Sequence, residues 1–227
     1  MTTSTVPTAR AQAAAVTGTL ITRLQTDYLN DRPQAVAALA RLRRGAGKEF
    51  AQVPDLWGLI DTGPLHRTAE DGGRPLNDQE LTRAENAVHV AITLWALHQQ
   101  SRPKGMHQPN HREKPRGLGT AVRRLMPPGD ITEPVLKRLI RAGNAPDLTT
   151  LSQRLRDIVL LLRGEDIDLD YALLAEQLCH WQEPGGRDAV RRAWGRSFHA
   201  YRAPNEADAN GQTPPDAATI DTLKDAS

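Results

Sequence analysis

Apolar residues along most of the chain recur at intervals of three and four, which is the spacing of one face of an α-helix. In the segment 148–162 this seam consists of Leu148, Leu151, Leu155, Ile158 and Leu162. In the segment 169–182 it consists of Tyr171, Leu174, Leu178 and Trp181. We find no alternation of apolar and polar residues of the kind that half-buried strands show. The pattern therefore predicts an all-α protein.

Eight longer segments are predicted to be helical: residues 9–29, 33–45, 77–100, 118–126, 132–143, 148–162, 169–182 and 187–202. A short helix is expected at 54–60, and residues 61–75 are interpreted as a loop because they are rich in Gly, Pro and Asp. The expected architecture is a bundle of about eight helices.

Local signals predict where some of these helices begin and end. Pro33 suits a first helical turn, and Gly45 and Gly143 suit helix ends. Asn77 followed by Glu80 is the pattern of a capping box. The buried stripe of the helix that begins there is predicted to consist of Val88, Ala91, Ile92 and Trp95.

The length of 227 residues suits one domain or two small ones. We assign residues 8–203 to an all-helical domain, built either as one bundle or as two packed sub-bundles, 8–100 and 117–203, joined by the loop 101–117. Residues 204–227 are polar and poor in large apolar side chains, so they are predicted to form a disordered acidic tail.

The net charge of +2 hides a segregation of charge along the chain. Residues 101–117 carry five cations and one acid, whereas residues 203–227 carry five acids and one cation. A basic body favours a polyanionic partner. The single cysteine excludes an internal disulfide and fits a reducing compartment. With no apolar run long enough for a membrane span, we expect a cytoplasmic protein.

Metal and nucleophile chemistry are poorly supported, and we expect no cofactor, no metal and no catalytic residue. His107 and His111 are separated by Pro109, so helical spacing does not apply to them. His89 and His98 lie on opposite faces of their predicted helix. All four are interpreted as surface or capping histidines.

The single thiol has only a weak claim to catalysis. Cys179 and His180 are sequence neighbours, and neighbours on a helix do not face each other. Cys179 lies close to the buried stripe of its helix, so we interpret it as a small core residue.

Two further motifs have ordinary explanations. The sequence RRGAGKEF lacks the first glycine and the Ser or Thr of a P-loop, although its backbone amides and cations could still hold a phosphate. The acidic run GEDIDLD contains Glu165, Asp166, Asp168 and Asp170 and could serve a hydrolase. We prefer helix capping by Asp168 or Asp170, because we expect no basic or metal partner to be fixed near the acidic run.

Clustered cations are the remaining candidate chemistry. Residues 101–141 hold ten cations and three acids. Surfaces rich in guanidinium groups bind phosphates through paired hydrogen bonds and gain from counterion release. Because few aromatic residues are expected at the surface, we predict contact with nucleic-acid backbones that tolerates any base sequence.

The sequence resembles the CasB family, whose members are the small subunit of the type I-E CRISPR surveillance complex called Cascade. The resemblance spans about residues 10–202. It rests on the order and spacing of LARLRRG, ITLWALHQQS, GMHQP, GLGTAVRRL, LKRLIRAGNA, LSQRLRDIVLLLR, LDYALLAEQLCHWQ and VRRAWGRSF. It implies an all-helical, non-enzymatic protein that pairs head to tail with a second copy. Its implied partners are the backbone and large subunits of Cascade, guide RNA, and target DNA, mainly the displaced strand of the R-loop.

The candidate nucleic-acid-binding residues come from two sources. The resemblance supplies Arg43, Arg44, Arg83, Arg123, Arg124, Arg141 and Arg156. Local charge alone supplies Lys48, Arg116, Lys137, Arg138 and Arg154. Two other functions stay open: a helical adaptor that only bridges protein subunits, and a hydrolase that uses the acidic run.

Overall fold

The computed structural model describes residues 8–66 and 75–201. Within them the chain forms nine α-helices, three 3-10 helices and no strand. The α-helices are α1 (Ala9–Leu29), α2 (Pro33–Leu42), α3 (Gly63–His66), α4 (Asp78–Gln99), α5 (Leu118–Arg124), α6 (Glu133–Gly143), α7 (Leu148–Gly164), α8 (Tyr171–Trp181) and α9 (Gly186–Ala200). The 3-10 helices are η1 (Arg43–Gly45), η2 (Phe50–Gln52) and η3 (Pro54–Leu56). The all-α prediction is confirmed.

Side-chain caps fix the starts of several helices, and two of these caps were predicted from the sequence. Asn77 accepts a hydrogen bond from the Glu80 amide, and the Glu80 side chain accepts one from the Asn77 amide, which confirms the capping box. Asp147 caps α7 through its side chain, and Asp170 caps α8. Of the two aspartates predicted as caps near α8, Asp170 is therefore the one that serves.

Short elements are where the sequence prediction was wrong. The helix expected at 54–60 is only the 3-10 turn η3, and α3 forms inside the segment interpreted as a loop. Leu65 anchors α3 because its side chain is buried in the core. Residues 67–74 of that segment and the predicted tail, 204–227, lie outside the described residues.

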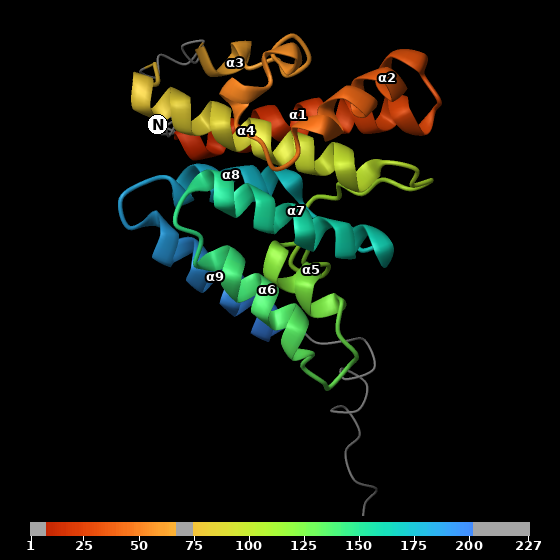
Figure 1. Ribbon diagram of the computed structural model, residues 1–227, viewed down its shortest axis with the longest axis vertical. Helices are drawn as coiled ribbons and strands as arrows, with labels where there is room; N and C mark the ends of the chain where they lie inside the picture. The colour runs from red at the N-terminus through yellow and green to blue at the C-terminus, as the bar shows by residue number, and fades with distance from the viewer. Residues whose placement is uncertain (1–7, 67–74, 202–227) are drawn as a thin grey trace, which may run out of the picture.

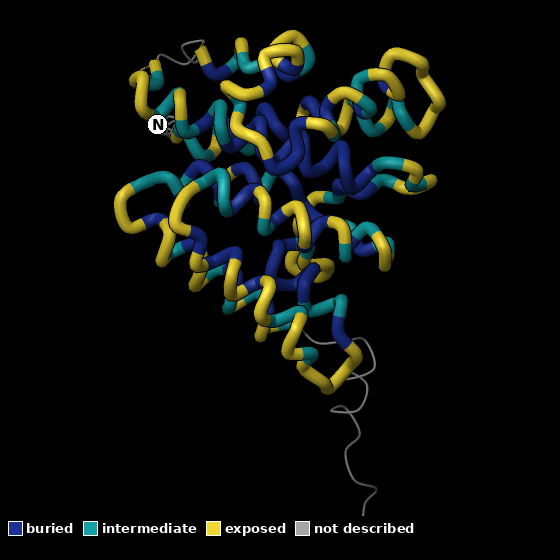
Figure 2. Tube along the Cα trace, viewed as in Figure 1, coloured by how far each residue is buried: buried dark blue, intermediate teal, exposed yellow. Residues whose placement is uncertain are grey.

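The helices stack in three tiers (Figure 1). Helices α1 and α4 form one tier with α2 and α3 at its outer side, α7 and α8 form the middle tier, and α5, α6 and α9 form the third. Helix α8 packs against both α1 and α4, so the two halves of the chain share one interface. One cluster of buried apolar residues extends from Ala13 to Phe198 (Figure 2). The division into two sub-bundles stays a prediction.

Helix α4 is the centre of the fold. The predicted stripe of Val88, Ala91, Ile92 and Trp95 is buried, but burial extends to every residue from 87 to 99. His89 and His98 lie on this enclosed stretch, so their interpretation as surface residues was wrong. Each has one hydrogen-bonded ring nitrogen, to the Lys48 carbonyl and the Tyr171 hydroxyl respectively. Burial lowers the pKa of each to about 4, which keeps both neutral at pH 7.

Helices α5 and α9 approach each other unusually closely. The Thr120 hydroxyl of α5 donates to the Ser197 carbonyl of α9 over 3.1 Å. A Cβ atom added at Gly119 would lie only 2.7 Å from the Phe198 amide nitrogen. The absence of a side chain at Gly119 therefore sets how near α5, which carries Arg123 and Arg124, lies to α9.

In the described part of the chain, the helices are all too short or too polar to cross a membrane.

Candidate nucleic-acid interface

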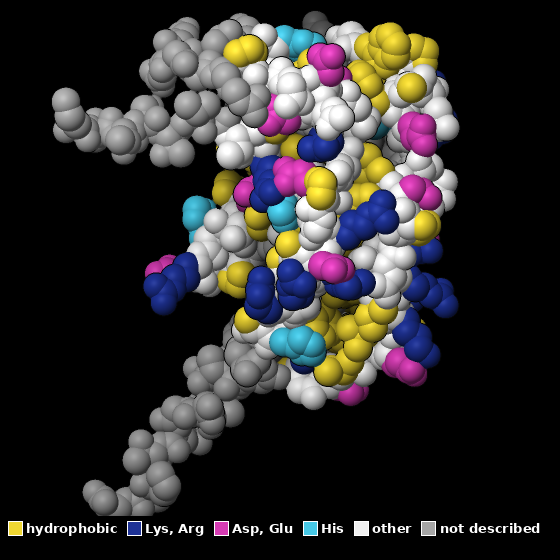
Figure 3. Space-filling model, turned by 90° about the vertical axis from the view of Figure 1, so that its left-hand side faces the viewer, with side chains coloured by type: hydrophobic (Ala, Val, Ile, Leu, Met, Phe, Trp, Pro, Cys, Tyr) yellow, Lys and Arg dark blue, Asp and Glu magenta, His cyan; other side chains and the backbone are white. Residues whose placement is uncertain are grey.

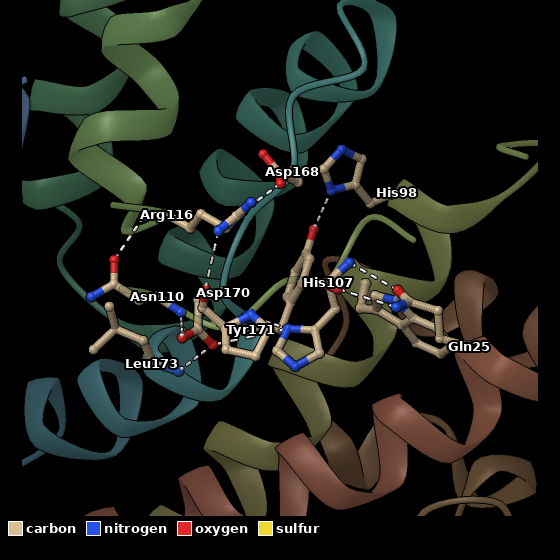
Figure 4. Close-up of polar contacts among 11 residues, drawn as sticks. Gln25, His98, His107, Asn110, Arg116, Asp168, Asp170, Tyr171 and Leu173 are labelled. Carbon is tan, nitrogen blue, oxygen red and sulfur yellow. Dashed lines mark hydrogen bonds and ion pairs between the residues drawn. The ribbon is translucent and has the colours of Figure 1, made fainter. Parts of the chain in front are cut away.

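The basic loop 101–117 is a fixed part of the structure (Figure 4). The Gln25 side chain of α1 accepts from the His107 amide and donates to the His107 carbonyl. The Gln99 side chain of α4 accepts from the Met106 amide and donates to the carbonyls of Arg102 and Lys104. The side-chain amides of Gln25 and Gln99 thus supply hydrogen-bond partners to backbone groups in the first half of the loop. These groups need partners within the protein because this part of the loop lies against the core.

His107 caps the start of α8 from outside the helix. Its Nδ1 accepts a hydrogen bond from the Tyr171 amide over 3.1 Å, and its side chain is only 4% exposed. Its interpretation as a surface histidine was wrong, whereas the capping role is confirmed. Burial lowers the pKa of His107, although the nearby Asp170 carboxylate opposes this. His111, which the sequence places four residues after His107, is exposed to solvent.

Three residues just before α8 hold the second half of the loop. Leu169 accepts from the Gln108 amide and donates to the Met106 carbonyl. Asp170 accepts from the Asn110 amide over 2.8 Å as well as capping α8, and its own amide donates to the Arg116 carbonyl. The segment 168–170 therefore acts as the anchor of the loop.

Asp168 joins two of the predicted nucleic-acid-binding arginines. Its Oδ2 accepts from Arg116 Nε and its Oδ1 accepts from Arg124 Nη1, both over 2.6 Å. Burial favours the neutral acid, but the hydrogen bonds and charges of the two arginines outweigh it and lower the pKa of Asp168. The expectation that no basic partner lies near the acidic run was wrong, because the partners are distant in sequence.

Arg116, Arg124 and Asp168 line a groove of about 520 Å³ that the sequence did not reveal. Lys114 is the third cation of the groove and was missed as a candidate. Its position next to Pro115 in a cation-rich loop was the only signal available in the sequence.

A second group of candidates lies around the turn after α2. Arg44 and Lys48 are exposed and Arg43 is half-buried. The Cδ of Arg156, from α7, lies 3.3 Å from where a Cβ of Gly47 would be, so this arginine lies against the same turn. The amides of Ala46 and Lys48 donate within the turn and are not available to a phosphate. These two amides therefore add nothing to phosphate binding at this turn, where the cationic side chains remain.

A third group joins α6 to α7. Arg154 donates to the Arg141 carbonyl at the end of α6, while Arg138 donates to the Pro134 carbonyl over 3.2 Å. Lys137 forms an exposed ion pair with Glu133 over 2.7 Å. Arg154 and Arg156 contact different neighbours, in agreement with their predicted placement on different sides of α7.

Two candidates lie apart from these groups. Arg123 donates to the Pro127 carbonyl at the end of α5. Arg83 lines a separate cavity of about 710 Å³ near the start of α4, together with Arg10 and Glu183, which pair with each other. The structure therefore does not assemble all twelve candidates into one patch.

The acidic run is used for structure. Asp166 pairs with Arg102 over 2.8 Å, Asp168 with Arg116 and Arg124, and Asp170 caps α8. Across residues 8–66 and 75–201, no group of three or more His, Cys, Asp or Glu side chains could hold a metal ion.

The thiol is enclosed, as predicted. Cys179 is buried, and burial raises its pKa to about 11, so it is a protonated core residue at pH 7.

An apolar groove of about 240 Å³ separates α6 from α9. Leu139, Trp194 and Phe198 form its buried part, and Ile140 on its rim is half exposed. Figure 3 shows the face of the molecule on which Lys and Arg side chains form a band and apolar side chains line a hollow below it.

The sequence model for the CRISPR-associated protein Cse2 matches residues 38–199, which is more than half of the chain. The chain belongs to the Cse2 family. CasB from Thermobifida fusca is a solved structure similar to this Cse2-family chain, with 46% sequence identity and a TM-score of 0.73. The similarity covers 83% of this chain and 98% of that one. The CasB resemblance read from the sequence is thereby confirmed.

Two more distant structures share the Cse2-family fold. A chain of a CRISPR RNA-guided surveillance complex has 20% identity and a TM-score of 0.59, covering 82% of this chain and 93% of that one. A Cse2-family protein from Thermus thermophilus has 20% identity and a TM-score of 0.56, covering 82% and 98%. A comparison with curated proteins gives no match.

Proposed function

We propose that this Cse2-family protein is the non-catalytic small subunit of a type I-E Cascade complex in the cytoplasm. In this role it contacts the backbone and large subunits, pairs head to tail with a second copy, and lies close to the guide RNA. Its cations hold the sugar–phosphate backbone of target DNA, mainly the displaced strand, and so stabilise the R-loop. Family membership and the 46% identity to CasB support the assignment to Cascade.

The observation that carries the nucleic-acid part of the proposal is a set of exposed cations without acidic partners. Within the described residues, none of these five side chains has an ion pair: Arg44, Lys48, Arg138, Arg141 and Arg156. Unpaired surface guanidinium groups release counterions from a phosphate backbone when they bind it. In RNA-guided complexes base pairing reads the sequence, so protein cations need only hold backbones.

Reconstitution with the other Cascade subunits and a guide RNA tests this function. The lifetime of the R-loop is measured with wild-type protein, with the triple variant Arg44→Gln, Arg141→Gln, Arg156→Gln, and without the subunit. We expect the triple variant to enter the complex but to shorten the R-loop lifetime. The slope of log affinity against log salt should fall by about 2, since each lost contact to a single strand removes roughly 0.7.

The matched control is Arg23→Gln, which removes an exposed cation of α1 that lies outside the proposed set. An R-loop lifetime that is equal for the triple variant, the control and the wild type would refute nucleic-acid contact by these residues. Failure of the wild-type chain to enter the ribonucleoprotein would refute the assignment to Cascade.

A helical adaptor without nucleic-acid contact is the second candidate function, and the apolar groove between α6 and α9 favours it. Partner subunits dock into such grooves by burying apolar side chains. For an adaptor, Ile140→Asp would prevent entry into the complex, while the triple cation variant would behave like wild type. Because Ile140 is half exposed, this substitution leaves the core intact.

A further inference from the structure

The groove between the basic loop and the end of α9 brings three cations together around a space of about 520 Å³. Lys114 is exposed at its edge, while the side chains of Arg116 and Arg124 are only 18% and 29% exposed. The groove therefore holds two guanidinium groups that are mostly enclosed, beside one ammonium group that extends into solvent.

We propose that this groove binds one phosphate of a nucleic-acid strand, with Arg124 and Lys114 as contacts and Asp168 as the positioning residue. The inference rests on the proposed function and deepens it, because it assigns a defined phosphate subsite. It also gives a role to Asp168, for which the sequence suggested only helix capping.

Asp168 fixes the orientation of both arginines. Each of its oxygens accepts one hydrogen bond over 2.6 Å, from Arg116 Nε and from Arg124 Nη1. Arg116 is held further by the carbonyls of Pro109 and Lys114, each 3.4 Å from its Nη1. Among the described residues, Arg124 uses only Nη1, so its Nε and Nη2 remain for an oxyanion. A guanidinium that is already oriented loses less conformational entropy when it binds phosphate.

The charges of the groove suit a single phosphodiester. Lys114, Arg116 and Arg124 contribute three positive charges, and Glu113 and Asp168 contribute two negative ones. The remaining charge of +1 balances the one negative charge of a phosphodiester. The groove is bounded by the loop, the end of α5 and the end of α9, and its volume of about 520 Å³ admits a phosphate group.

The direction in which Asp168→Asn changes the binding affinity shows whether Asp168 positions the arginines or only alters the local charge. If Asp168 only lowers the local positive charge, Asp168→Asn adds one net positive charge and strengthens binding. If Asp168 positions the arginines, the same change releases both guanidinium groups and weakens binding.

The experiment measures binding of a fluorescent single-stranded DNA to the full chain across a range of salt concentrations. We expect Lys114→Gln and Arg124→Gln each to weaken binding about tenfold at low salt and to lower the salt slope by roughly 0.7. Asp168→Asn should weaken binding severalfold in spite of its more positive charge. Arg23→Gln is the control for loss of one exposed cation elsewhere, and far-UV circular dichroism verifies folding of each variant.

Each outcome decides a different point. If wild type binds with a steep salt dependence and Lys114→Gln and Arg124→Gln match Arg23→Gln, the subsite is wrong and the proposed function stands. Tighter binding by Asp168→Asn overturns the positioning role. Should Asp168→Asn not fold, Asp168→Glu keeps the charge but displaces the carboxylate, and wild-type affinity in that variant overturns the role equally. No binding by the wild-type chain at low salt overturns both the subsite and direct DNA binding by the subunit alone.

Discussion

Gly119 gives the sharpest prediction for the fold, since its replacement by alanine forces two helices apart. A Cβ at this position would lie 2.7 Å from the Phe198 amide nitrogen, and closer still to the Trp194 carbonyl oxygen. Ordinary contact begins at 3.4 Å, so relieving the Phe198 contact alone needs a movement of about 0.7 Å, and the closer Trp194 oxygen requires α5 to move further still. Backbone atoms cannot rotate away as a side chain does.

The expected loss of stability follows from two opposing effects. Overpacking of this kind costs about 3 kcal/mol, the upper part of the usual range, because the clash is with backbone atoms. Replacing glycine by alanine within a helix returns about 1 kcal/mol. We therefore expect Gly119→Ala to lower the free energy of unfolding by roughly 2 kcal/mol and the melting temperature by roughly 4–8 °C.

Gly195→Ala is the matched control within the same helix pair. A Cβ at Gly195 meets no atom within 4 Å, so only the gain in helix propensity applies, and stability should rise by up to about 1 kcal/mol. Urea unfolding followed by tryptophan fluorescence measures both variants, with Trp194 buried at the affected contact. Equal stability of the two variants would show that the close approach of α5 to α9 does not govern stability.

Three further predictions concern buried groups. Because the pKa values of His89 and His98 are lowered from 6.5 to about 4, the folded state binds fewer protons than the unfolded state between these pH values. The free energy of unfolding should therefore be highest above pH 6.5 and should fall by up to about 3 kcal/mol per histidine toward pH 4. Thermal melting across this pH range measures the loss, and His89→Gln should make the pH dependence weaker. Asp170→Ala should lower the free energy of unfolding in urea by about 2 kcal/mol, since it removes both the cap of α8 and an anchor of the loop. Asp147→Ala removes only the exposed cap of α7 and should lower it less, so a larger loss for Asp147→Ala would contradict this reasoning. Cys179 should react with a thiol reagent only after unfolding in urea, and rapid reaction of the native protein would show that the thiol is accessible.

Helices with clear periodicity and caps were predictable from the sequence. The bounds of α1 match the predicted 9–29, because its apolar residues repeat regularly and Asn30 and Pro33 follow it. By contrast, α3 and η3 are too short to show a periodic pattern, and only tertiary burial of Leu65 and Leu56 stabilises them.

The sequence predicted only part of the burial of α4. Its apolar stripe indicated one buried face, whereas the polar residues His89, Thr93, His98 and Gln99 gave no sign that the rest of the helix is buried too. Each of these polar side chains finds a hydrogen-bond partner inside the protein, which makes burial tolerable only in the complete fold. Patterns of single residues do not report such partners.

The candidate interface was predictable as a set of cations but not as a geometry. Arg116 and Arg124 stand out by charge, yet the residue that joins them, Asp168, lies 52 and 44 positions away in the sequence. Contacts over such separations depend on how α5, α8 and the loop pack together. The sequence therefore predicted which side chains carry charge but not which carboxylate orients them.

A helix surrounded by protein on all sides along residues 87–99 has a consequence for larger assemblies. Bending or sliding this central helix would open voids in the close-packed interior around it, which protein interiors resist because they are barely compressible. If the proposed complex changes shape around this protein, the protein should therefore move as one rigid body, and its surface cations should keep their mutual spacing throughout the movement.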